Sequence, residues 1–194
     1  MTAEVDQKGT LRNLIAESSG KLRRAIGDVP EDLFGKRPGP HLNPVGFIYF
    51  HVLRSWDEDL NVICRGQVPD GDAWHRAGLS DELDYEPLGR GRGGRGVGVG
   101  FSDAEVDAVP KRRDVLTRYH DLLDAETTVY FNALANDDLN TQREHQILKA
   151  RGVDAFTIAS QLRMIALHHA EHSGDIKFVK GMLGMPDSTY PGAS

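Results

Sequence analysis

The sequence of 194 residues has one cysteine, Cys64, and no long apolar run. A single thiol cannot close an internal disulfide, which excludes the small secreted domains that such bonds hold together. No stretch approaches the roughly 20 apolar residues of a transmembrane helix, and residues 1–10 lack the apolar segment of a signal peptide. We therefore expect a cytoplasmic protein with no membrane partner.

Positive charge is also in short supply. The chain has 23 Lys and Arg residues against 29 Asp and Glu residues, which gives a net charge of -6. Nucleic acids and anionic membranes attract positively charged surfaces, so we expect no nucleic-acid partner. The lone thiol of Cys64 ends an apolar helical pattern, a position that is typical of packing rather than of catalysis.

Four stretches of the chain show the apolar periodicity of helices with one buried face. Their expected bounds are about 9–28, 44–64, 102–134 and 153–183. No convincing pattern of alternating polar and apolar residues predicts a strand. The sequence therefore predicts an all-α fold, a four-helix bundle built from one domain.

Local signals mark the ends of these helices. Asn43 and Pro44 suit the cap and first residue of the second helix, while Ser102 and Glu105 have the spacing of a capping box. Pro110 predicts a kink or a restart within the third helix. These signals favour four helices with uneven connections.

The connection between the second and third helices, residues 65–101, is too long for a simple turn. We expect a short helix of its own within residues 70–83. A glycine-rich loop, residues 84–100, completes this long irregular link.

Three glycines of this loop, Gly89, Gly91 and Gly94, have the spacing G-x-G-x-x-G. A dinucleotide-binding turn follows a strand and opens a helix, and neither flank is present in the pattern. Three arginines of the loop offer an alternative contact with RNA or an anionic ligand, namely Arg90, Arg92 and Arg95. The composition favours a flexible surface loop over both alternatives.

Residues 166–174, "ALHHAEHSG", carry three histidines in five positions. On a helical wheel His172 lies in the middle of the apolar stripe, with His168 and His169 on either side. One buried histidine usually finds a hydrogen-bond partner, whereas a cluster spaced by four residues can direct two ring nitrogens at one ion. A shared metal ion is therefore the better explanation of this cluster.

The second helix offers a third ligand, because His51 lies on its apolar face. If the second and fourth helices are neighbours, His51, His168 and His172 form a three-histidine site with an open position, as in catalytic zinc sites. Pairing of His169 with His172 stays open as an alternative. The remaining histidines fall on connections or polar patterns and offer no obvious fourth ligand: His41, His75, His120 and His145.

The same stretch also reads H-x-x-E-H, the motif of inverted zinc proteases. That motif takes a glutamate ligand from further along the chain, and none of the 22 residues after His172 is a glutamate. The protease interpretation therefore fails. Among the acids near the histidines, Glu58 is better placed than Asp57 or Glu171, yet no catalytic or cofactor-binding residue is predicted from spacing alone.

The chain resembles the DinB-like superfamily, four-helix bundle proteins related to the mycothiol- and bacillithiol-dependent transferases. The resemblance rests on the histidine within "FIYFHVLRS" and on the H-x-x-x-H-x-G pattern of "HHAEHSGDIKFVKGML", and it extends over about residues 10–183. It implies one domain over residues 1–194, with residues 184–194 as a tail, and His51, His168 and His172 as metal ligands. Asp175 replaces the glutamine that many members carry after the glycine.

The resemblance implies a divalent-metal-dependent enzyme acting on a small molecule, with transfer of a low-molecular-weight thiol preferred. A metal-dependent hydrolase and a non-enzymatic metal-binding bundle are the alternatives. Zinc or nickel is the first candidate for the ion, followed by iron and manganese, since imidazole suits all of them. A homodimer is the candidate assembly.

Overall fold

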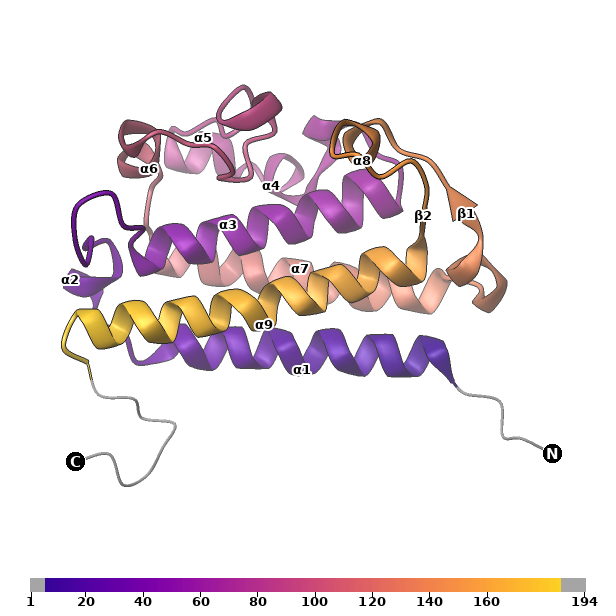
Figure 1. Ribbon diagram of the computed structural model, residues 1–194, viewed down its shortest axis with the longest axis horizontal. Coiled ribbons are helices and arrows are strands. Elements are labelled where there is room, and N and C mark those ends of the chain that lie inside the picture. The colour runs from indigo at the N-terminus through magenta and orange to yellow at the C-terminus, as the bar shows by residue number, and fades with distance from the viewer. Residues whose placement is uncertain (1–5, 186–194) are drawn as a thin grey trace.

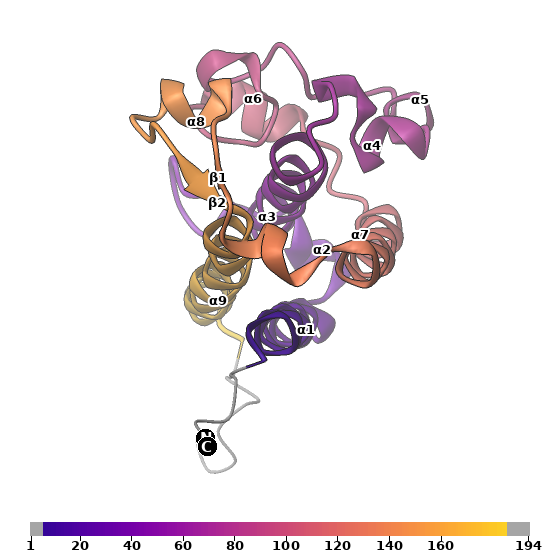
Figure 2. The ribbon, with the colours of Figure 1, turned by 90° about the vertical axis from the view of Figure 1, so that its right-hand side faces the viewer.

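The computed structural model describes residues 6–185, and they form an all-α fold around four long helices (Figure 1). These are α1 (Gln7–Gly27), α3 (Val45–Asp57), α7 (Arg113–Ala133) and α9 (Ile158–Met182). Helices α1 and α9 run in one direction, and α3 and α7 run in the other. The end-on view shows their cross-sections grouped as a bundle, which confirms the predicted fold class (Figure 2).

Helix α1 begins almost where its periodicity predicted. The side chain of Asp6 caps it by accepting a hydrogen bond of 2.8 Å from the backbone N–H of Gly9. Its buried face includes Leu11, Ile15 and Leu22, which pack toward α9 and α7. After it comes only a single helical turn, α2 (Glu31–Phe34), before α3.

Helix α3 is the central element of the molecule. Every residue of α3 except His51 is buried, because other elements cover it on all sides (Figure 2). It passes without a break into a π-helical segment, η1 (Glu58–Cys64), in which the N–H of Arg65 bonds to the carbonyl of Leu60. The expected helix over residues 44–64 is therefore correct in extent, but its last part has a wider turn.

The start of α3 differs from the prediction. Pro44, not Asn43, is the residue at the cap, and it makes no side-chain capping bond. The backbone of Pro44 is itself extended, with ψ of 157°, and its carbonyl accepts the first helical bond from the N–H of Ile48, so the helix begins one residue later than predicted.

The long link between η1 and α7 folds over α3 (Figure 1). It contains η2 (Pro69–Gly71), α4 (Ala73–Arg76), α5 (Leu79–Leu83), η3 (Arg92–Gly94) and α6 (Asp103–Ala108). Helices α4 and α5 confirm the predicted helical segment within this link.

Pro110 separates α6 from α7, so the predicted third helix is two helices and the proline marks a restart. Ser102 and Glu105 form the expected capping box at the start of α6. Helix α7 then begins at Arg113, eleven residues after the expected start at residue 102.

The connection from α7 to α9 contains the only described strand pairing. It runs through η4 (Asn136–Asn140), β1 (Gln142–Arg143), α8 (Gln146–Ala150) and β2 (Phe156–Thr157), with the two strands antiparallel. Helix α9 starts at Ile158 rather than at residue 153, because Thr157 and Ser160 form a capping box there.

A buried carboxylate ties α3 to the link. Asp57 is fully buried, and its oxygens accept five hydrogen bonds, from Asn61 Nδ2 at 2.6 Å, Ala73 N at 2.9 Å, Trp74 N at 2.9 Å, the Tyr119 hydroxyl at 2.5 Å and Arg54 Nη1 at 3.5 Å. One side chain therefore joins η1, α4 and α7 to α3.

Within residues 6–185, no helix combines the length and the apolar character that crossing a bilayer requires. The single-domain boundary at residues 1–194 stays a prediction, and the expected tail at 184–194 lies mostly outside the described residues.

Candidate metal centre

His51 lies midway along α3, and a backbone carbonyl orients its ring. The Nδ1–H of His51 donates a hydrogen bond of 2.5 Å to the carbonyl of Val97, a residue of the glycine-rich loop. A proton on Nδ1 leaves the lone pair of Nε2 free, so His51 has the tautomer that suits metal binding.

His168 and His172 reach the same point from α9, one helical turn apart. The Nε2 atom of His168 lies 3.2 Å from Nε2 of His51 and 2.9 Å from Nε2 of His172. The Nδ1–H of His172 donates to the carboxylate of Asp175 at 2.7 Å. The aspartate that departs from the family pattern thus orients one of the three rings.

The arrangement of the three Nε2 atoms suits binding of a shared cation better than hydrogen bonding among the three rings. His51 and His172 each carry a proton on Nδ1, so two lone pairs converge on the single Nε2 of His168. All three ligand atoms lie within 4.8 Å of one another, compatible with zinc-to-nitrogen bonds of about 2.0–2.1 Å. These residues can hold a divalent ion, and binding of an ion stays a prediction.

Burial keeps the imidazoles of His51 and His168 uncharged. Desolvation lowers the pKa of His51 to about 4, helped by the charge of His172 and opposed by the bond to Val97. Desolvation also lowers the pKa of His168 to about 3. Neutral rings are the form that binds metals, so these two rings are ready to accept an ion at neutral pH.

His169 faces away from this cluster into the bundle core. It is fully buried, its Nδ1 lies 3.2 Å from the Ser18 hydroxyl, and its ring packs on Trp56 at 4.5 Å between centroids. The expected position of His172 in the middle of the buried stripe is wrong. His169 is there, while His172 lies at the half-buried edge facing α3.

His120 was also misplaced by the sequence pattern. It is fully buried in α7, where its two ring nitrogens contact the Tyr49 hydroxyl at 2.8 Å and the Ser19 hydroxyl at 2.7 Å. With both nitrogens occupied by hydroxyl groups, His120 is part of a buried hydrogen-bonded group and not a metal ligand.

The family model that matches the chain is that of the DinB superfamily, over residues 15–176. The chain belongs to the DinB superfamily. A conserved protein from Enterococcus faecalis has a similar crystal structure, with a TM-score of 0.71, 11% identity and coverage of 93% of this chain and 99% of that one. YfiT from Bacillus subtilis is similar at a TM-score of 0.57 and 14% identity, over 96% of this chain and 93% of that one.

YfiT is described as a probable metal-dependent hydrolase with an unusual four-helix bundle topology. At these identities the likeness concerns the fold alone. No curated protein matches the chain.

The glycine-rich loop of this DinB-superfamily protein is not the surface segment that its composition predicted. Its Val97 is buried, and the guanidinium of Arg95 binds the carboxylate of Glu58, with 2.8 Å from Nε to Oε1. Arg90 stacks on the ring of Tyr85. The loop folds against α3 and supplies the carbonyl that orients His51.

Gly98 allows this close approach of the loop. Its φ is +94°, and an added Cβ would lie 3.2 Å from Cβ and Nδ1 of His51 and 3.2 Å from Phe47. Gly98→Ala is therefore expected to move the Val97 carbonyl and to weaken metal binding by about 10–100-fold, the usual effect of losing such a partner. Competition with a chromogenic chelator measures this affinity.

Gly89→Ala is the matched control for this change. Gly89 also has a positive φ, +85°, but nothing lies within 4 Å of its added Cβ. Both variants introduce a backbone strain of about 1–2 kcal/mol, because alanine disfavours a positive φ. Only Gly98→Ala should also change the metal affinity. Equal affinities in the two variants would contradict a role for the loop.

Two cavities meet at the histidines. The larger, of about 540 Å³, lies between α3, α8 and α9 and is lined by His51, His168 and Asp59 among others. The smaller, of about 210 Å³, is lined by His51, His172 and Asp175. The ring of His51 therefore belongs to the walls of both.

The acidic residues near the histidines lie in different environments. Glu58 is buried but is paired with Arg95 and with Arg151 at 3.2 Å, beside a separate cavity that has no histidine in its wall. Glu171 is exposed on α9. The acid that lines the histidine cavity is Asp59, which the sequence analysis did not single out.

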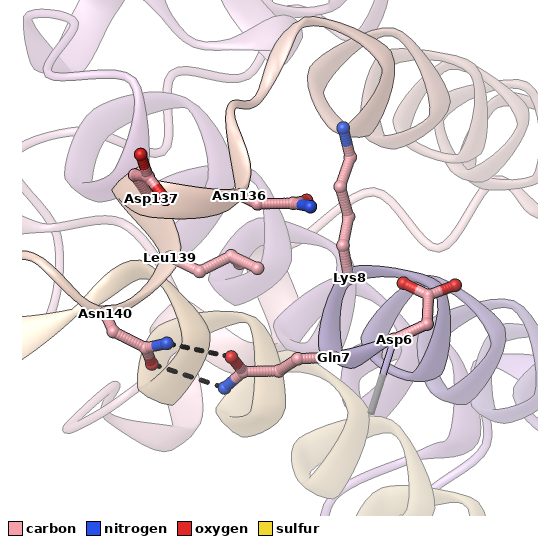
Figure 3. A pocket seen from close by; sticks show the side chains of 7 residues that line it. All are labelled: Asp6, Gln7, Lys8, Asn136, Asp137, Leu139 and Asn140. Carbon is pink, nitrogen blue, oxygen red and sulfur yellow. Dashed lines mark hydrogen bonds between the residues drawn. The ribbon is translucent and has the colours of Figure 1, made fainter. Parts of the chain in front are cut away.

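A further pocket, of about 560 Å³, lies between the start of α1 and η4 (Figure 3). The side-chain amides of Gln7 and Asn140 bond to each other across it, at 2.9 and 3.3 Å, and Lys8 Nζ donates to the carbonyl of Leu134. Its wall contains no histidine or cysteine. This pocket has none of the ligands found at the histidine cluster.

Proposed function

We propose that this protein is a divalent-metal-dependent enzyme that transfers a low-molecular-weight thiol to a small electrophilic substrate. The observation that carries the proposal is a pair of cavities that share His51, one also lined by His168 and the other by His172. A transfer between two organic molecules needs a binding space for each of them. Attack by water needs only one such space.

The histidines supply the conditions for this chemistry. His51, His168 and His172 would hold the ion through neutral nitrogens, and Val97 and Asp175 fix two of the rings. A bound divalent ion with no anionic ligand would lower the pKa of a thiol or of water that joins it. Zinc and nickel are the first candidates, followed by iron and manganese.

Metal-dependent hydrolysis is the second candidate. It is favoured by the description of YfiT, whose fold this chain shares, as a probable metal-dependent hydrolase. A closed, non-enzymatic metal site is the third alternative, and it requires a fourth protein ligand. The described residues within 4.8 Å of one another supply three.

The test uses protein loaded with cobalt(II) and titrated with N-acetylcysteine. A thiolate-to-cobalt charge-transfer band is expected, because the thiol should take the open position and lose its proton. A spectrum that changes with small anions but not with the thiol would favour hydrolysis. A spectrum that responds to neither would indicate a closed site.

The cytoplasmic location and the homodimer stay predictions. Light scattering on the purified full chain tests the homodimer directly. We expect the mass of two chains, each of 21.4 kDa.

A further inference from the structure

The π-helical segment η1 gives two neighbouring acids opposite environments. Glu58 is held by Arg95 and Arg151, whereas Asp59 lines the cavity that also contains His51 and His168. A π turn accommodates an extra residue and so changes the directions of the side chains that follow, and such turns are frequent at functional sites. Here the turn brings a carboxyl group to the wall of the histidine cavity.

Among the residues that the structure describes, none forms an ion pair with Asp59. It is 8% exposed, and its hydrogen-bond partner is the side chain of Gln161 on α9. Burial raises the pKa of Asp59 to about 8, with a further rise from the charge of Glu58 and opposite contributions from Gln161 and Arg95. At neutral pH the group is therefore a carboxylic acid, able to donate a proton.

The other charged groups near Asp59 are accounted for. Arg151 from the end of α8 lines the same cavity but is bound to Glu58, and Arg163 on α9 lines it as an exposed residue. Cys64, further along η1, is buried, and burial together with the charge of Asp59 raises its pKa. None of these groups replaces Asp59 as a proton donor inside the cavity.

We propose that Asp59 is the general acid of this site and that it protonates the leaving group of an electrophilic substrate bound in the larger cavity. The proposal rests on the proposed function and deepens it by naming the class of substrate. That substrate has an oxygen or nitrogen leaving group, because such an atom needs a proton as its bond to carbon breaks. Most of the cavity wall around Asp59 is apolar and suits an apolar body: Val99, Leu148, Val153, Ala155, Phe156 and Met164.

The reaction balances as follows. A thiol releases its proton to solvent, and its sulfur forms a bond to the electrophilic carbon. The bond from that carbon to the leaving oxygen or nitrogen breaks, its electron pair stays on the leaving atom, and the proton of Asp59 joins that atom. The carboxylate of Asp59 then regains a proton from solvent, so the net change is thiol plus substrate giving thioether or thioester plus protonated leaving group.

The first test compares the wild type with Asp59→Asn, which keeps the shape and removes the acid. Two acetate esters serve as probes, one with a 4-nitrophenolate leaving group and one with an alkoxide leaving group, each with N-acetylcysteine or with water as nucleophile. Loss of a general acid costs about 100-fold or more for the alkoxide, which needs a proton, and much less for the nitrophenolate. Glu171→Gln is the control. It changes an exposed acid on α9 that does not line the cavity, so this variant should match the wild type.

The outcomes separate the two proposals. An equal loss for both esters, or no loss, overturns the role of Asp59 and leaves thiol transfer standing. The expected leaving-group difference with water alone as nucleophile keeps Asp59 and overturns thiol transfer. A wild type that turns over neither ester with either nucleophile overturns both.

The second test does not depend on activity. In the metal-free protein, the folded state holds the Asp59 proton up to a pKa of about 8, whereas an unfolded aspartate loses it near a pKa of about 3.9. The folded state binds more protons between these values, so stability falls as pH rises through the window. The unfolding constant of the wild type should therefore rise relative to that of Asp59→Asn by up to about tenfold per pH unit, and parallel pH dependences would overturn the proposal.

Discussion

Replacement of His168 with alanine is expected to abolish stoichiometric metal binding, while replacement of the adjacent His169 is expected to preserve it. The two side chains leave α9 in different directions, His168 toward Nε2 of His51 and His169 toward Ser18 and Trp56. Loss of one of three ligands should weaken binding by about 100-fold or more, beyond the loss seen for outer partners. Elemental analysis of protein purified without a histidine tag measures the bound ion.

The same pair of variants should show the opposite order in stability. His169→Ala removes a fully buried ring and is expected to lower the free energy of unfolding by about 2–4 kcal/mol. His168→Ala in metal-free protein removes a half-buried side chain and should cost less. If His169→Ala lost the ion and His168→Ala kept it, the alternative pairing of His169 with His172 would be correct.

The largest loss of stability is expected at Asp57. Asp57→Ala leaves two backbone N–H groups, of Ala73 and Trp74, and the Tyr119 hydroxyl without their acceptor, all of them buried. Arg54, also buried, would lose one of its two carboxylate neighbours. Breaking such a buried group costs about 3–5 kcal/mol.

Chemical unfolding monitored by fluorescence of the two tryptophans measures this effect. Asp154→Ala is the matched control, because Asp154 is exposed in the turn before β2 and should change stability by less than about 0.5 kcal/mol. A loss of under about 1 kcal/mol for Asp57→Ala would mean that water replaces the carboxylate at these donors.

The sequence predicted the number of long helices and the three clustered histidines because both depend on spacing within one helix. His168 and His172 are one turn apart, so any helix there places them together. It could not tell which flank of the α9 stripe meets α3, since that depends on how the helices pack. His169 and His120 were therefore assigned to less buried positions than they have.

The preference for Glu58 over Asp57 and Glu171 missed Asp59 for a different reason. A wheel with 3.6 residues per turn places Glu58 near the stripe of His51, but η1 has wider turns and directs Asp59 to the histidine cavity instead. The role of Val97 was equally hidden, because glycine-rich composition gives no sign of a long-range hydrogen bond. Both failures arise from tertiary structure that local periodicity does not encode.

The hydrogen bond between His51 and Val97 joins residues 46 positions apart in the chain. Contacts between distant residues form late in folding, because the chain between them must first lose conformational entropy. His51 and His168 are 117 positions apart, so by the same reasoning the loop can close on α3 before α9 docks, and Val97 already orients the ring of His51 when His168 and His172 arrive. Tight capture of the ion would then follow the docking of α9, and the rate of metal uptake during refolding would report on that last step.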